Sequence, residues 1–97
     1  MKLLAIGRPR PGIDARASIA PHARDEVAAL WQMYRSGLVR EIYSPGGPGI
    51  VMVLEASSPE EAKAALDGLP LLANDIVGIE LIPLQPFTAL TVLFEGR

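Results

Sequence analysis

Two short and almost continuous apolar runs, at residues 2–6 and 50–54, are the strongest feature of the hydrophobic pattern. Both runs are apolar at odd and at even positions. A run of this length and kind is typical of a strand that is buried on both faces. We therefore expect these two segments to be the central strands of a sheet.

Two further segments predict strands at the edges of that sheet. Residues 39–44 alternate, so that Val39, Glu41 and Tyr43 are expected on one face, and charged side chains in the middle of a strand suit an edge. Residues 76–84 predict the last strand of the sheet. Pro83 restricts this strand to a position where its amide is not needed, which also favours an edge.

Residues 21–36 have the periodicity of a helix, and Gly37 is placed to end it. The apolar face of this helix is expected to carry Val27, Leu30, Trp31 and Tyr34. The two aromatic residues are either core side chains whose polar ends need a partner, or part of the lining of a pocket.

A second helix follows the 50–54 strand, and Ser58, Pro59 and Glu61 mark its beginning. Serine can cap the helix, proline suits the first helical position, and the glutamate completes a capping box. A narrow stripe of small and aliphatic residues then follows at helical spacing, made up of Ala62, Ala65, Leu66 and Leu69. Gly68 and Pro70 predict that the helix ends near residues 67–69.

Three segments are predicted to connect these elements. Residues 7–21 are rich in proline and arginine and are expected to form a loop, either a solvated one or a lid or rim. The glycine-rich residues 45–49 join two strands as a hairpin. They lead into a strand and no lysine follows them, so we do not expect a phosphate site there. Residues 71–75 are expected to be a simple connector.

The resulting order of strand, helix, strand, strand, helix and strand is that of a ferredoxin-like βαββαβ domain of the α+β class. Two helices can cover only one face of a four-stranded sheet, yet the central strands are apolar on both faces. Soluble monomers rarely leave such a patch exposed. We therefore expect a homodimer with the sheets back to back, a dimeric α+β barrel.

We expect residues 1–97 to form a single domain whose end is an arm at the interface between subunits. Residues 84–97 include an apolar stretch at 87–94 that has no evident place within one subunit. It is predicted to form a fifth strand or an extended arm that reaches the partner or a neighbouring dimer.

Composition restricts the classes of partner and compartment. Of 97 residues, 49% are hydrophobic, which is high for a small monomer and favours self-association. The formal net charge of −2 gives no reason to expect nucleic acid or an anionic membrane as a ligand. There is no cysteine, the apolar start is too short for a signal peptide, and no run is long enough to span a membrane. We expect a cytoplasmic protein.

Residues 37–90 resemble the muconolactone isomerase-like families of dimeric α+β barrels. The resemblance is carried by Gly37 with Arg40, the Glu55-Ala56-Ser57 junction that leads to Pro59, Leu69-Pro70-Leu71, and Ile82-Pro83-Leu84 followed by Pro86-Phe87. It implies a dimeric barrel, assembly into larger oligomers, and cofactor-free movement of a double bond in an unsaturated lactone that bears a carboxylate.

A weaker similarity to the YCII-related proteins, which have the same fold, concerns His22. Those proteins carry a histidine near the start of the first helix, as this chain does, and pair it with an aspartate in an Asp-Pro element. Here that element is Leu69-Pro70, so a His-Asp dyad is not expected.

Isomerisation next to a carbonyl group needs a proton acceptor, a hydrogen-bond donor for the dienolate and a cation for a carboxylate. The candidate acceptors are His22, Glu80 and Glu55. His22 is suited by its chemistry to exchange protons near neutral pH, and either glutamate would become a base if it were desolvated. Each is otherwise a solvated or ion-paired residue.

The candidate substrate-binding residues are Arg40, Tyr43, Trp31, Tyr34 and Arg8, and Arg10 is a further possible carboxylate clamp. Tyr43 and Arg40 are expected on opposite faces of their strand. One histidine and no cysteine give no basis for a metal site.

Three functions stay open at this point. The first is a cofactor-free isomerase acting on a small, apolar, carboxylate-bearing molecule in a pocket between the first helix and the sheet. The second is a non-catalytic protein that binds a small anionic or apolar ligand or another protein. The third is cofactor-free oxygenation, which needs an oxidisable substrate that the sequence does not reveal.

Overall fold

The computed structural model describes residues 1–96. The elements follow one another as β1 (Lys2–Pro9), α1 (Ala15–Ile19), the 3-10 helix η1 (Ala20–His22), α2 (Ala23–Ser36), β2 (Val39–Tyr43), β3 (Ile50–Glu55), α3 (Pro59–Leu66), α4 (Pro70–Ala73), β4 (Val77–Pro83) and the 3-10 helix η2 (Thr88–Phe94). The predicted ferredoxin-like α+β order is confirmed.

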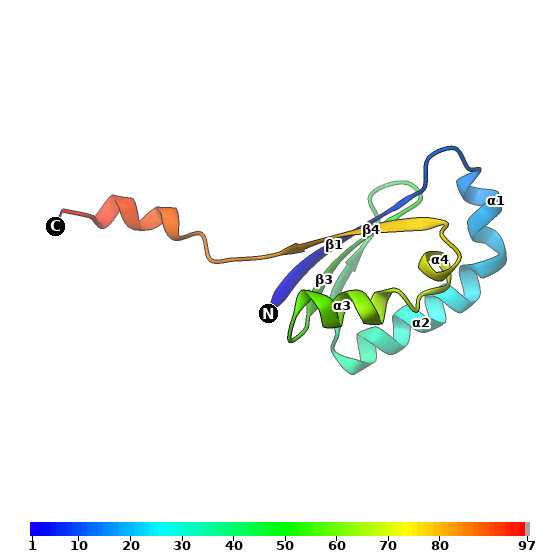
Figure 1. Ribbon diagram of the computed structural model, residues 1–97, viewed down its shortest axis with the longest axis horizontal. Coiled ribbons are helices and arrows are strands. Elements are labelled where there is room, and N and C mark those ends of the chain that lie inside the picture. Colours follow the sequence, from blue (N-terminus) through cyan, green and yellow to red (C-terminus); the bar gives the residue numbers. More distant parts are fainter. Residues whose placement is uncertain (97) are drawn as a thin grey trace.

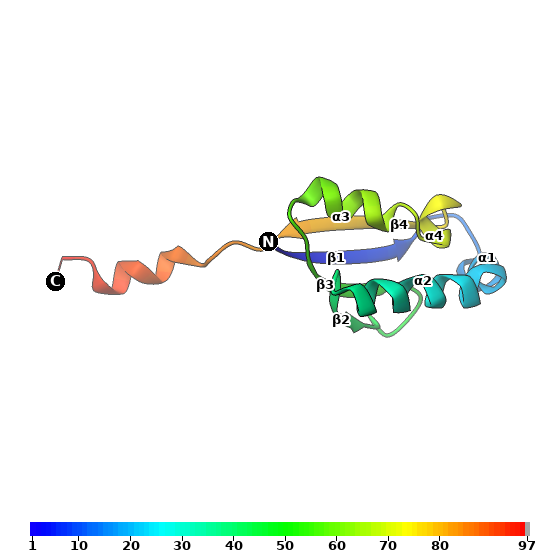
Figure 2. The same ribbon diagram turned by 90° about the horizontal axis from the view of Figure 1, so that it is seen from below.

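The four strands form one antiparallel sheet in the order β2-β3-β1-β4. The two apolar runs are its central strands, and the charged β2 and the proline-containing β4 are its edges, as predicted. The helices pack against one face of the sheet (Figure 1). Seen from that side, α3 lies along β4, α2 lies over β3 and beside β2, and β1 runs between the two helices (Figure 2).

The core lies between this helical layer and the sheet. Leu3 and Ala5 of β1 and Met52 and Leu54 of β3 point toward the helices and are completely buried. From α3, the predicted stripe contributes Ala62, Leu66 and, just beyond its end, Leu69. The small alanine side chain allows α3 to approach the sheet closely.

The opposite face of the sheet is also apolar. Leu4 lies between Val53 on β3 and Ile82 on β4, and Ile6 lies beside Val51. These side chains are partly exposed, and no helix within residues 1–96 covers them (Figure 1). We call this surface, made up of Leu4, Ile6, Val51, Val53 and Ile82, the open sheet face.

Residues 7–21 differ from the predicted loop, because they extend β1 to Pro9 and contain α1 and η1. Asp14 caps α1, where its side chain accepts a hydrogen bond from the Ala17 amide at 3.1 Å. The long helix α2 consequently begins at Ala23, after η1.

Strand β2 contains an irregularity that the alternation did not predict. Val39 pairs with Leu54, but Glu41 pairs with Val53, so the register shifts between Val39 and Glu41. Val39 therefore faces the core and is 1% exposed, whereas Glu41 and Tyr43 face the other side. The prediction that all three share a face was wrong for Val39 because of this β-bulge.

The predicted connector at residues 71–75 is partly helical. Pro70 occupies the first helical position of α4, a place where its missing amide costs nothing. As a result Leu71 turns inward and is buried.

The end of the chain is an arm and not a fifth strand. It leaves the sheet after β4 and carries η2 away from the domain (Figure 1). Phe87, Leu90, Val92, Leu93 and Phe94 are between 58% and 75% exposed.

Candidate functional site

An apolar cavity of about 270 Å³ lies between the helices and the end of the sheet. Its walls come from α1 and α2 (Ile19, Glu26, Leu30), the β2–β3 loop (Gly47, Pro48, Gly49), the sheet (Ile50, Val77, Ile79), and α4 with the residue before it (Leu69, Leu71, Leu72). A cavity of this size suits a small molecule and is a natural first candidate for a binding site.

Glu26 is the polar side chain of this cavity. It lies in the first turn of α2 and is only 8% exposed. One of its oxygens, Oε1, accepts a hydrogen bond from the Leu71 amide at 3.0 Å, so the carboxyl group links α2 to α4. His22 precedes Glu26 by one helical turn, a spacing that places two side chains on the same side of a helix.

The environment of Glu26 shifts the pKa of its carboxyl group. Burial raises the pKa of Glu26, because an ionised carboxylate is poorly solvated in an apolar cavity. The hydrogen bond from Leu71 and the electrostatic influence of His22 act in the opposite direction and offset part of this rise in pKa. A carboxyl group with a raised pKa is suited to both accepting and returning a proton near neutral pH.

The cavity wall formed by the β2–β3 loop depends on glycine. Gly49 has φ 134°, and a side-chain carbon there would lie 2.7 Å from the main-chain oxygen of Gly7. Any other residue at position 49 would therefore have an unfavourable backbone conformation, and its Cβ would clash with the Gly7 oxygen. Glycine allows the loop to lie directly against the end of β1 and to contribute main chain to the wall.

No protein-family model matches the sequence, and no curated protein matches it significantly. Solved structures do match. The 5-chloro-2-hydroxyhydroquinone dehydrochlorinase TftG from Burkholderia phenoliruptrix AC1100, in complex with 2,5-dihydroxybenzoquinone, is 14% identical with a TM-score of 0.68. The match covers 92% of this chain and 98% of that one.

Muconolactone isomerase is 22% identical with a TM-score of 0.67, and the match covers 89% of this chain and 90% of that one. The chain has the muconolactone isomerase fold. The fold predicted from residues 37–90 is thereby confirmed, and it extends over most of the chain.

None of the predicted site residues lines the cavity of this muconolactone isomerase fold, but His22 acts on the Glu26 carboxyl group. It ends η1, is partly buried, and stands close enough to Glu26 to influence its charge. The structure therefore brings His22 together with Glu26, which the sequence analysis did not select.

The predicted bases Glu80 and Glu55 are both exposed and outside the cavity lining. Glu80 and the predicted binding residue Arg8 form a loose ion pair at 3.7 Å near the edge of the open sheet face. Glu55 bonds to the amino group of Met1, and this bond lowers the pKa of Glu55. Neither carboxylate has the desolvated surroundings that the prediction required.

Arg40 and Tyr43 are held by local contacts on β2. Arg40 donates from Nε to the Gly37 carbonyl oxygen at 2.6 Å. Tyr43 donates its hydroxyl hydrogen to Glu41 at 2.6 Å, and this bond, with the charge of Glu41, raises the pKa of Tyr43. Neither side chain lines the cavity.

Trp31 and Tyr34 are surface residues, so the interpretation of them as core aromatics was wrong. They are 56% and 48% exposed, and their rings stack at 6.0 Å. Together with Val27, Leu30 and Ile42 they line a shallow apolar groove formed by α2 and β2. The reason is that α2 turns its Glu26, Leu30 and Met33 side toward the rest of the fold.

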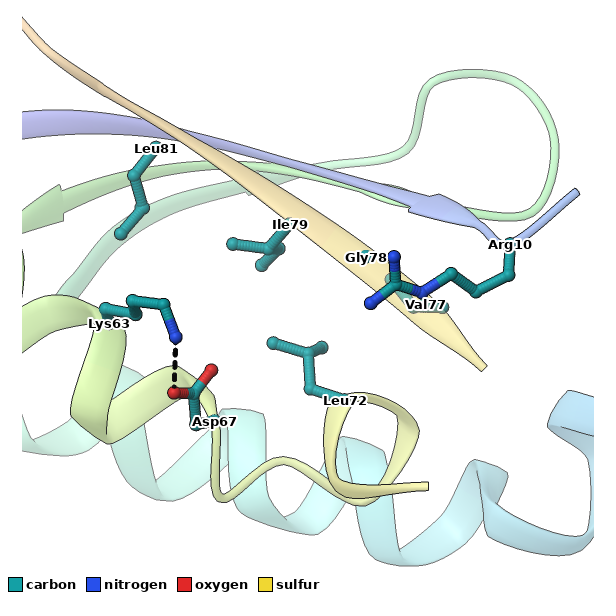
Figure 3. A pocket seen from close by; sticks show the side chains of 8 residues that line it. All are labelled: Arg10, Lys63, Asp67, Leu72, Val77, Gly78, Ile79 and Leu81. Carbon is teal, nitrogen blue, oxygen red and sulfur yellow. Dashed lines mark hydrogen bonds and ion pairs between the residues drawn. The ribbon is translucent and has the colours of Figure 1, made fainter. Parts of the chain in front are cut away.

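A second groove, of about 320 Å³, lies between α3 and β4 (Figure 3). Its apolar floor includes Leu72, Ile79 and Leu81. The two basic side chains at its rim are already paired, Lys63 with Asp67 and Arg10 with Asp75, each at 2.8 Å. The groove therefore offers a ligand no unpaired charged side chain in its lining, and we place the site in the more apolar Glu26 cavity.

Within residues 1–96, no group of three or more histidine, cysteine or acidic side chains is placed to hold a metal ion. In the same part of the chain, no helix has the length and apolar character needed to cross a membrane.

Proposed function

We propose that the protein is a cofactor-free isomerase that moves a proton, and with it a double bond, in a small unsaturated lactone or carboxylate. The observation that carries this proposal is the Glu26 carboxyl group, which is buried in an apolar cavity of about 270 Å³. An acid-base group in water-poor surroundings is the minimum equipment for proton transfer next to a carbonyl group.

In the proposed reaction, ionised Glu26 removes a proton from a carbon atom activated by the substrate carbonyl group. The C–H bond breaks and its electron pair enters a dienolate. The carboxylic acid of Glu26 then returns the proton to a different carbon atom of the dienolate, and the double bond has moved. Protons and electrons balance without an added reagent.

Two neighbouring features support this role for Glu26. His22 stands one turn away and lowers the pKa of the Glu26 carboxyl group. Gly47 and Gly49 contribute only main chain to the wall, so we assign the stabilisation of the dienolate oxygen to their amide groups. Arg40, Tyr43, Glu80 and Glu55 have no part in the proposed step.

The named activities of the similar structures agree with this assignment. Muconolactone isomerase is named for an isomerisation, and TftG for the loss of hydrogen chloride from a hydroxylated ring. We place this isomerase in the cytoplasm, which fits a chain without cysteine.

Proton NMR in D2O with muconolactone as the substrate tests the proposal. We expect deuterium to enter the ring and the double bond to move, and Glu26→Gln to lower the rate by roughly 10²–10⁴-fold. Asp25→Asn is the matched control, because it removes an exposed carboxylate from the adjacent position of α2 and should leave the rate unchanged.

Other results would contradict the isomerase. Binding without movement of the double bond would favour the alternative of a non-catalytic ligand-binding protein. Consumption of oxygen during turnover would favour the oxygenase alternative. Full activity in Glu26→Gln would remove Glu26 from the mechanism.

We also infer that the protein works as an assembly of copies of itself. The open sheet face is apolar and lacks a covering layer within residues 1–96, so a second copy placed back to back would bury it. The apolar arm then supplies a contact to the partner or to a neighbouring dimer.

A further inference from the structure

The charge distribution of the cavity restricts its ligand more narrowly than the proposed function does. Glu26 is the only ionisable side chain among the described residues that line the cavity, and the others are aliphatic residues, proline and glycine. A carboxylate on a ligand would therefore find no opposite charge in the lining and would share a small volume with a second carboxylate.

We infer that the cavity binds an uncharged, enolisable ring compound, such as an unsaturated lactone, and discriminates against ligands that carry a carboxylate. This inference rests on the proposed function and names the substrate class of the same site. The inferred ligand differs from the substrate implied by the resemblance to muconolactone isomerases, because it lacks a carboxylate.

Electrostatics gives the first reason. Two like charges repel strongly in surroundings of low polarity, and a buried charge needs a partner or several hydrogen bonds to offset its lost hydration. For Glu26, the Leu71 amide at 3.0 Å and the nearby His22 offset part of this cost. No basic side chain lines the cavity to offset the charge of a second carboxylate.

The arginines that the sequence offered as carboxylate clamps or binding residues give the second reason. Arg10 is paired with Asp75 at 2.8 Å, and Arg8 with Glu80 at 3.7 Å. Arg40 donates to the Gly37 carbonyl oxygen at 2.6 Å. None of these three lines the cavity, so the carboxylate clamp expected from the sequence is missing from the wall that surrounds Glu26.

An uncharged ring meets the opposite conditions. Its apolar carbon atoms replace water along the aliphatic wall, and a C–H group next to the carbonyl is brought to the carboxylate that must accept its proton. A lactone oxygen needs only a neutral hydrogen-bond donor, which main chain can provide.

Three related ligands separate charge from size. The first is 5-methylfuran-2(5H)-one, an unsaturated lactone without a carboxylate, the second is muconolactone, and the third is muconolactone methyl ester, which has the bulk of the second ligand without its charge. Isothermal titration calorimetry at neutral pH measures each affinity. We expect the ester to bind about tenfold or more tightly than the carboxylate, as repulsion at short range requires.

The same titrations in Glu26→Gln identify the source of the discrimination. Glutamine keeps an oxygen that can accept from the Leu71 amide but has no charge, so the difference between ester and carboxylate should narrow at least severalfold. In Asp25→Asn the difference should be unchanged. The comparison of the three ligands on the parent protein holds even if Glu26→Gln does not fold.

The outcomes separate this inference from the proposed function. Muconolactone binding as tightly as its ester, or a preference unchanged in Glu26→Gln, would overturn the inference and leave the isomerase standing. Failure of all three ligands to bind would overturn the proposed function, and the inference with it.

Discussion

The burial of Glu26 favours its proposed catalytic role but lowers the stability of the fold. Its carboxyl group is 8% exposed and has one hydrogen bond, from the Leu71 amide. A buried charge with so few partners disfavours folding. The same burial raises the pKa of Glu26 and would thereby make its carboxylate an effective base. The residue that we assign to catalysis is therefore expected to reduce stability.

The pH dependence of stability follows from the same shift. Because burial raises the pKa of Glu26 above its value in the unfolded chain, the folded protein favours the protonated form. The contribution of this group to stability is complete below the unfolded pKa and is lost as pH rises through the folded pKa. Glu26→Gln should remove that loss and raise the free energy of unfolding at neutral pH by about 1 kcal/mol.

Urea unfolding followed by circular dichroism between about pH 4 and about pH 8 measures this effect. The advantage of Glu26→Gln should grow with pH and disappear in acid. Asp25→Asn should change stability little at either pH, because that side chain is exposed. Equal destabilisation of Glu26→Gln at all pH values would show that the hydrogen bond to Leu71, and not desolvation, dominates.

At the scale of elements, the sequence predicted what depends on local chemistry and on a simple alternation of faces. Ser58 was expected to cap the second helix, and its hydroxyl oxygen accepts from the Glu61 amide at 3.1 Å. The two continuous apolar runs became the central strands. In each case the signal lies within a few residues and needs no knowledge of distant contacts.

What the sequence did not predict depends on contacts between distant residues. The bulge in β2 is a matter of register with β3, and the face that α2 turns inward is decided by packing. We assigned Val27, Trp31 and Tyr34 to the inner face, whereas Glu26 and Leu30 face the cavity. Glu26, Leu30 and Met33 have the i, i+4, i+7 spacing of one helix face and could have indicated the inward face. That face was missed because one of its members is a charged residue.

The short helix α1 is an element that one side chain largely determines. It has five residues, too few to be stable alone, and it holds Ile19 at the cavity wall. Asp14→Ala removes the acceptor for the Ala17 amide and should increase the hydrogen-exchange rate of Ala17 and Ser18, with a loss of about 1 kcal/mol at most in stability.

Asp14→Asn is the matched control for this prediction, because asparagine caps helices as well as aspartate does. It should keep exchange close to that of the parent protein. Fast exchange in both variants would indicate that the charge of Asp14 matters more than its hydrogen bond. Unchanged exchange in Asp14→Ala would mean that packing alone holds α1 in place.

On the scale of the whole molecule, two of the apolar surfaces that the helices of residues 1–96 leave uncovered lie apart from the cavity. One is the open sheet face, and the other is the arm, where Phe87 and Phe94 are 75% and 70% exposed. The arm points away from the domain (Figure 2), and the longest extent of the chain is 60 Å. Each of the two surfaces can therefore contact a different copy of the chain.

Substitutions on each surface should then have different effects on assembly. Leu4→Glu introduces a charge at the centre of the open sheet face, between Val53 and Ile82. An unpaired charge in a buried interface is strongly unfavourable, so we expect this variant to be monomeric at concentrations where the parent chain is a dimer. A chain that ends at Gln85 lacks the arm and should still form the dimer, but no larger assembly.

Sedimentation velocity at micromolar protein distinguishes these states. Ala64→Glu, on the exposed side of α3, adds the same charge away from both surfaces and should assemble like the parent chain. Circular dichroism must show that Leu4→Glu remains folded, since Leu4 is only partly exposed in one subunit. A parent chain that sediments as a monomer would remove the back-to-back dimer, because the open sheet face would then be stable in water without a second copy.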